Sequence, residues 1–246
     1  MNLLIIFGIG LAASFFGSFM SGGLSMISLS ALIAFGFAPH VAIGTFAVGA
    51  MGFDIGGLTQ YMKKDKVVWS MFWPLTIIGV IASLLGSIWV VKLDTNILTK
   101  VIGFSVLIFI PISLYNKKLG IVEKKVTARS KTIGYCLSAP LSFYGASIGV
   151  GYGLFSVFNK MYFFGLPLLK AKATGKLPNM IGGIASLVVF GISGVIDWQA
   201  TPFLFAGMFM GSTLGTHYAI RLGDTWLRNI LLVTIGLFSL KLILGL

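Results

Sequence analysis

The sequence predicts an all-α, polytopic membrane protein built as two inverted repeats, each opening with a broken or re-entrant helix. Three observations predict this fold class. Apolar runs of membrane-spanning length recur along the chain, the two halves carry matching landmarks, and each half has a glycine-rich interruption near its start. Hydrophobic residues make up 57% of the 246 residues and charged residues only 10%, which leaves too little polar surface for a soluble domain of this length.

The apolar runs each approach the roughly 20 residues that cross a hydrocarbon core of about 30 Å. They are Leu3–Met20, Val41–Met62, Trp69–Val91, Ile97–Tyr115, Leu177–Ile192, Thr201–Ile220 and Leu227–Leu244. Such runs indicate helices that span lipid, so the lipid bilayer is the expected surrounding. We expect a multi-pass protein of the cell inner membrane or plasma membrane.

The basic residues concentrate in loops. A net charge of +12 would suggest nucleic acid in a soluble protein, but here it fits the excess of Lys and Arg on the cytoplasmic side of membrane proteins. We therefore expect no nucleic-acid partner. The most basic loop, residues 117–131, separates a first transmembrane repeat (1–116) from a second (132–246).

The two repeats are inferred from matching landmarks. S-F-F-G at Ser14–Gly17 matches S-F-Y-G at Ser142–Gly145. Further matches share a shift of about 129 residues, which favours an internal repeat over chance. These pairs are Gly36 with Gly165, Thr45 with Thr174, Trp69 with Trp198, and Gly86 with Gly215.

Each half opens with an interrupted helix. As one straight helix, residues 3–37 would be about 52 Å long, far more than a bilayer needs, so the chain must break at S-G-G-L-S (Ser21–Ser25). G-V-G-Y-G at Gly149–Gly153 is the equivalent in the second half. The two opening helices of each half then cross the membrane twice or not at all, and three spans follow. Each half therefore crosses an odd number of times, so the second half has the opposite orientation to the first.

This architecture favours alternating access, with a solute site near the midplane between the repeats. Helix N-termini at the breaks would present free N–H groups to an anion, although small residues also serve close helix packing. The candidate residues at the breaks are Gly22, Gly23, Ser25, Gly149 and Gly151.

K-A-T-G-K-L-P-N, residues 172–179, places lysines beside an apolar run. The run after Lys176 would be only about 24 Å long as a helix, which draws Lys176 to the membrane edge or inside. Lys170 and Lys172 are expected to be interfacial anchors that extend to headgroups. Lys176 is either another anchor or part of a solute site with Thr174 and Asn179, on a backbone distorted near Pro178.

Asp54 is the only carboxylate within an apolar span. An ionisable group at that depth is a functional hypothesis. It could carry a coupling proton, form an ion pair with Lys176, or be a protonated structural residue. Cys136 is the only cysteine, so a disulfide or cysteine metal site within the chain is excluded, and no metal or cofactor is expected.

A-T-G-K-L-P-N-M-I-G-G-I-A-S-L-V-V-F at Ala173–Phe190 resembles the second-half signature of the TauE/SafE sulfite exporter family, A-T…K-x-x-N-x-x-S-N-x-A-x-L-x-x-F. G-V-I-D-W at Gly194–Trp198 and F-G-F-A-P-H-V-A-I-G-T at Phe35–Thr45 are also similar to that family. The resemblance implies two inverted repeats that transport small sulfur-containing anions, such as sulfite or organosulfonates.

Two departures separate this chain from the family pattern. Gly182-Gly183 replaces the family's S-N, and Gly44-Thr45-Phe46-Ala47 stands where many members have G-T-N-K. The positions that still match are Thr45, Thr174, Lys176 and Asn179, and the resemblance implies that they contact the solute.

The leading hypothesis is a secondary transporter that moves a small anion, a sulfur oxyanion or organosulfonate, by alternating access. One alternative is a proton- or cation-coupled carrier of another solute, centred on Asp54. A second is a membrane scaffold whose glycines only pack helices. No H-E-x-x-H motif or nucleophile elbow is present, so we do not expect an enzyme. A homo-oligomer is left open.

Overall fold

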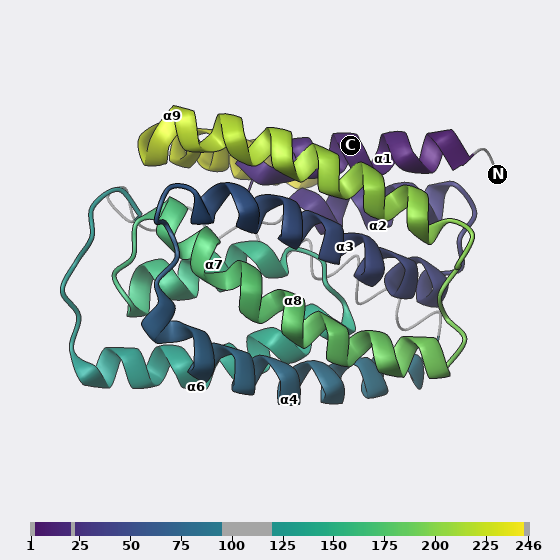
Figure 1. Ribbon diagram of the computed structural model, residues 1–246, viewed down its shortest axis with the longest axis horizontal. Coiled ribbons are helices and arrows are strands. Elements are labelled where there is room, and N and C mark those ends of the chain that lie inside the picture. The colour runs from purple at the N-terminus through teal and green to yellow at the C-terminus, as the bar shows by residue number, and fades with distance from the viewer. Residues whose placement is uncertain (1–2, 21–22, 95–119, 244–246) are drawn as a thin grey trace.

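The computed structural model describes residues 3–20, 23–94 and 120–243, and every regular element in this part of the chain is a helix (Figure 1). The predicted span Ile97–Tyr115 lies outside the described residues. The elements are α1 (Leu3–Phe19), α2 (Gly23–Ala34), α3 (Pro39–Met62), the 3-10 turn η1 (Trp69–Met71), α4 (Phe72–Val91), α6 (Ala128–Ser147), α7 (Tyr152–Phe163), α8 (Leu168–Ile192) and α9 (Thr201–Ile243).

Three segments of the described chain are long and apolar enough to cross a membrane: Pro39–Met62, Trp69–Val91 and Leu168–Ile192. Large apolar side chains on the outer face of α4, including Ile77 and Ile81, are exposed by more than half. A continuous apolar face of this kind suits contact with lipid. The predicted all-helical membrane class is therefore confirmed.

Two helices differ from the sequence expectation. α8 begins at Leu168 and continues to Ile192 as a helix with Pro178 inside it, so the expected distortion near Lys176 is wrong. α9 joins two predicted spans, but Gly223 has non-helical angles (φ 78°, ψ 173°) and kinks the helix between them.

The helix breaks fall where the glycine clusters predicted them. α1 ends at Phe19 and α2 begins at Gly23, while α6 ends at Ser147 and α7 begins at Tyr152. Gly149 and Gly151 both have left-handed backbone conformations (φ 72° and 73°), which glycine adopts without the steric cost of a Cβ. α2 packs back against α1, and α7 against α6, so each half opens with a helical hairpin.

The two halves are interleaved. α1 and α3 of the first half pack against α9 of the second, while α6 and α8 of the second half pack against α4 of the first. α3 and α8 pack against each other and join the two groups (Figure 1). The contact of α1 with α9 corresponds to that of α6 with α4, and the contact of α3 with α9 corresponds to that of α8 with α4.

Glycines set how closely the interleaved helices approach. On α9, three glycines one turn apart lie against backbone carbonyls of α1, so a Cβ at any of them would come within 2.6 Å of a carbonyl oxygen. The pairs are Gly207 with Phe7, Gly211 with Leu11, and Gly215 with Phe15. Small residues permit this close backbone contact in membrane helices. Because both residue numbers rise together, α1 and α9 run parallel.

The second pair of packed helices behaves in the same way. Gly79 of α4 lies near Pro178 of α8, and further along both helices Ser186 Oγ donates to Ser83 O at 3.3 Å. α4 and α8 therefore also run parallel. Figure 1 shows α1 and α6 beginning at opposite ends of the molecule.

Candidate functional site

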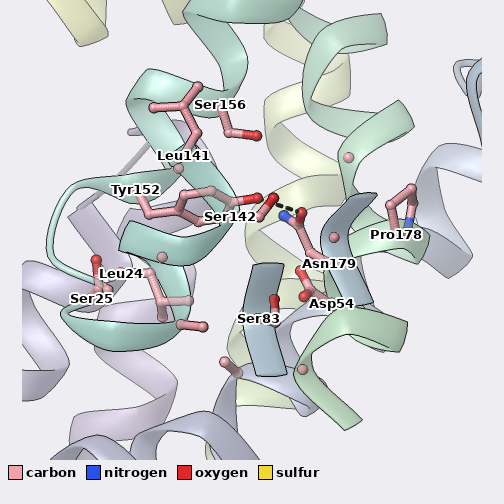
Figure 2. Close-up of a pocket in the computed structure, with 18 of the residues that line it drawn as sticks. Leu24, Ser25, Asp54, Ser83, Leu141, Ser142, Tyr152, Ser156, Pro178 and Asn179 are labelled. Atoms are coloured by element: carbon pink, nitrogen blue, oxygen red, sulfur yellow. Dashed lines mark hydrogen bonds between the residues drawn. The ribbon is translucent and has the colours of Figure 1, made fainter. Parts of the chain in front are cut away.

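A cavity of about 220 Å³ lies between the two halves of the chain (Figure 2). Its lining comes from α1, α2, α3 and α4 of the first half and from α6, α7 and α8 of the second. Ligand pockets for drug-sized molecules are typically about 300–1,000 Å³. The cavity is therefore of a size for a small solute.

The predicted site residues divide into two groups. Those that line the cavity are Ser25, Asp54, Gly149, Lys176 and Asn179. Those that lie elsewhere are Gly23, Thr45, Gly151 and Thr174, whereas Gly22 lies outside the described residues.

Lys176 and Asp54 form an ion pair between α8 and α3. Lys176 Nζ lies 3.1 Å from Asp54 Oδ1, and the two side chains are 6% and 14% exposed. The same ammonium donates to Phe53 O at 3.1 Å and lies 3.2 Å from the centroid of the Phe53 ring. Because a buried charge is costly unless it is paired, this network accounts for both residues within the membrane. It also occupies most of the donor capacity of Lys176.

Two further lysines line the cavity. Lys172 is buried, and its Nζ donates to Ser18 O at the end of α1. The expectation that Lys172 is an interfacial anchor is wrong, because α8 begins earlier than the apolar run and turns this residue inward. Its position four residues before Lys176 was a signal that both share one helix face. Lys170 is instead part-exposed and pairs with Glu123 at 2.6 Å.

Lys160 of α7 was not predicted as a site residue. It is 4% exposed, and its Nζ donates to Ser156 Oγ at 2.6 Å and Ser156 O at 3.2 Å. Neither Lys160 nor Lys172 pairs with an acidic side chain among the described residues. No local sequence signal marks Lys160, since α7 faces the cavity only because it folds back on α6.

Tyr152 fixes the orientation of Asn179. The Tyr152 hydroxyl donates to Asn179 Oδ1 at 2.9 Å (Figure 2). With its oxygen accepting this bond, the amide presents Nδ2 as its remaining donor. Both residues line the cavity.

The helix breaks of the two halves meet, but not as expected. The Gly151 N–H donates to Ser25 Oγ at 3.1 Å. The prediction that the Gly151 amide faces an anion is therefore wrong for this arrangement, because a side chain from the first half already accepts its hydrogen bond. Ser25 thereby links α2 to the start of α7.

Thr45 and Thr174 also hold the backbone of the opposite half. Thr45 Oγ1 accepts from Asp197 N at 3.0 Å, and Thr174 Oγ1 accepts from Val68 N at 3.1 Å. Both threonines are buried and lie outside the cavity lining. Each hydroxyl holds the segment before the next helix of the opposite half, and solute contact by either one stays a prediction.

Comparison with known proteins identifies the family of this chain. The family described as sulfite exporter TauE/SafE matches residues 6–242. A "probable membrane transporter protein" of Haemophilus influenzae is 28% identical over 98% of this chain and 94% of its own length. The "probable membrane transporter protein YfcA" of Escherichia coli K12 is 25% identical over 97% of this chain and 88% of its own.

A third relative, the "probable membrane transporter protein ORF9" of Sinorhizobium, is 23% identical over 98% of this chain and 92% of its own length. No solved structure matches the chain. The family match covers almost every residue, including all the cavity-lining helices. The chain therefore belongs to the sulfite exporter TauE/SafE family of membrane transporters.

Proposed function

We propose that the protein is a secondary transporter that moves a small anion, a sulfur oxyanion or organosulfonate, through the cavity between its halves. One observation carries this proposal: Lys160, Lys172 and Lys176 are buried around one cavity, and Asp54 is the only acidic residue among the described residues that line it. Buried charge without a counter-charge is costly. A bound anion would supply the missing negative charge.

The proposed mechanism is alternating access by two inverted repeats, residues 1–116 and 132–246, joined by the basic segment 117–131. The exchange of partners between halves and the opposite starting ends of α1 and α6 (Figure 1) support it. In transporters of this kind the solute binds near the midplane, between repeats that rock against each other. A multi-pass position in the cell inner membrane or plasma membrane follows.

Ligand-dependent stability tests the proposal. The purified protein in detergent would be heated with sulfite, thiosulfate, sulfate, sulfoacetate, taurine or chloride at fixed ionic strength. A ligand at 100 times its Kd stabilises a protein by about 2.7 kcal/mol, so a saturable rise in Tm with at least one sulfur anion is expected. A panel in which no anion gives a saturable rise contradicts the proposal.

A second candidate is a proton- or cation-coupled carrier of another solute, centred on Asp54. The observation that favours it is the position of Asp54 in the cavity wall, on α3, where α3 meets α8. In this case Asp54→Asn abolishes flux into liposomes, while Lys176→Ala has the smaller effect. The anion hypothesis expects lysine substitutions to act on anion affinity itself.

A further inference from the structure

We infer that Lys160 and Asn179 form an oxyanion seat above Gly175, and that Lys160, rather than Lys176, supplies the positive charge that meets the solute. This inference rests on the proposed anion transport and assigns the charged contact within that site. It follows from how the cavity lysines are partnered, from the closeness of two donors to Gly175 and from the orientation of one amide.

The cavity lysines differ in their partners. Lys176 is paired with Asp54 at 3.1 Å and donates to a carbonyl of α3. Lys172 donates to Ser18 O, at the end of α1, where helix carbonyls lack intrahelical partners. Lys160 reaches only Ser156, one turn earlier on its own helix. Of the three cavity lysines, Lys160 is thus the one whose hydrogen bonds all stay within its own helix, α7.

No acidic side chain elsewhere in the chain can neutralise Lys160. The sequence contains six acidic residues, and all of them fall within the described segments. None of these six described residues forms an ion pair with Lys160, and Glu123 and Asp54 pair instead with Lys170 and Lys176. The counter-charge for Lys160 is therefore left to a ligand.

Gly175 brings the two donors close to one stretch of α8. A Cβ built on Gly175 would lie 3.2 Å from Lys160 Nζ and 3.7 Å from Asn179 Nδ2. The ammonium from α7 and the amide nitrogen from α8 thus both lie beside the one residue of this stretch that has no side chain. Gly175, Lys160 and Asn179 all line the cavity.

The orientation of Asn179 completes the seat. Its Oδ1 accepts the Tyr152 hydroxyl at 2.9 Å, and its Nδ2 donates to no group among the described residues. A cation and an amide donor side by side can each bind one oxygen of the same group, and bonds to a charged partner are the stronger kind. The ligand class is an oxyanion: a sulfite, a sulfonate or a carboxylate.

Two substitutions test the seat independently. Lys160→Gln removes the charge while keeping a polar side chain of similar length. Gly175→Ala keeps every charge and adds a methyl group that would crowd Lys160 Nζ at 3.2 Å, so the ammonium must shift. Gly191→Ala is the matched control, because it lies on the same helix, outside the cavity, with nothing within 4 Å of its added Cβ. Lys176→Gln is compared as the competing charge.

The readout is the Kd of sulfite, thiosulfate and sulfoacetate, from the dependence of Tm on anion concentration in detergent. We expect Lys160→Gln to weaken binding by about tenfold to a hundredfold, the range for a hydrogen bond to a charged group. Gly175→Ala should weaken it by at least about threefold. Gly191→Ala should leave the Kd of each anion unchanged.

The outcomes separate this inference from the function beneath it. If the unsubstituted protein binds an anion and Lys160→Gln binds it equally well, the seat is overturned while anion transport stands. If Lys176→Gln alone abolishes binding, Lys176 is the charged contact and the seat is again overturned. If the unsubstituted protein binds none of the anions, the proposed function fails, and the seat with it.

Discussion

Both halves open with a helical hairpin, α1–α2 in the first and α6–α7 in the second, but the two hairpins carry different side chains. In the first half, α2 carries no charged side chain, and the end of α1 is bound by Lys172 from the other half. In the second half, α7 carries Lys160, and the glycines before it adopt left-handed conformations. All three cavity lysines come from residues 160–176, whereas the first half supplies Asp54, the cavity's acidic residue.

This difference teaches that two halves can share their backbone contacts while their side chains differ. Gly86 and Gly215, which match in the sequence, show the shared part, because each glycine faces a backbone carbonyl of the opposite half. Lys160 shows the part that differs, since α2 has no charged residue. Substitutions at matching positions of the two halves can test whether the helix packing is symmetric and the cavity is not.

The largest effect is expected when the ion pair between the halves is broken. Asp54→Asn leaves Lys176 buried without its counter-charge, a change that costs about 3–5 kcal/mol in buried pairs. Asp54→Asn combined with Lys176→Gln should recover much of that loss, because no lone charge remains. The measurement is the free energy of unfolding in detergent, compared in a double-mutant cycle. Equal losses in the single and double variants would exclude a coupled pair.

Glycine substitutions should affect both halves alike. Gly86→Ala and Gly215→Ala would place a Cβ 2.4 Å and 2.6 Å from a carbonyl oxygen, and overpacking of this kind costs up to about 3 kcal/mol. We expect similar decreases in Tm for the two variants. Gly8→Ala is the control, because its added Cβ meets nothing within 4 Å. A large decrease for one variant and none for the other would contradict symmetric helix packing.

The threonine bridges should show a smaller, matched effect. Thr45→Val and Thr174→Val each leave a backbone N–H, of Asp197 or Val68, without its acceptor. Both bonds are only part-buried, so we expect each substitution to cost about 1 kcal/mol. Tm in detergent measures the loss, and the Kd of a bound anion should not change. Loss of anion binding with an unchanged Tm would instead assign these hydroxyls to the solute.

The smallest effect concerns the cavity alone. Tyr152→Phe removes the hydroxyl that holds Asn179 Oδ1, so the amide is less well oriented toward an anion. We expect a loss of about threefold in sulfite or sulfoacetate affinity, near the lower end for one neutral hydrogen bond. Tyr162→Phe on the exposed face of the same helix is the control. An equal loss of anion affinity in both variants would contradict the positioning role of Tyr152.

The sequence by itself determined the helical membrane class and the places where the opening helices break. It also pointed to Lys176, Asp54 and Asn179, and all three line the cavity. The class and the breaks could be predicted because they rest on local physics. Apolar length decides which segments enter lipid, glycine decides where a backbone can turn, and an ionisable group in an apolar span is costly wherever its partner lies.

Only the tertiary structure decided what each of these side chains touches. Lys172 binds a carbonyl 154 residues away, and Thr45 and Thr174 each accept a backbone N–H of the opposite half because the halves interleave. Lys160 enters the cavity because α7 packs back on α6 and lies over a glycine of α8. Such partners depend on which distant helices meet, and no pattern along one segment encodes the distance between two side chains on different helices.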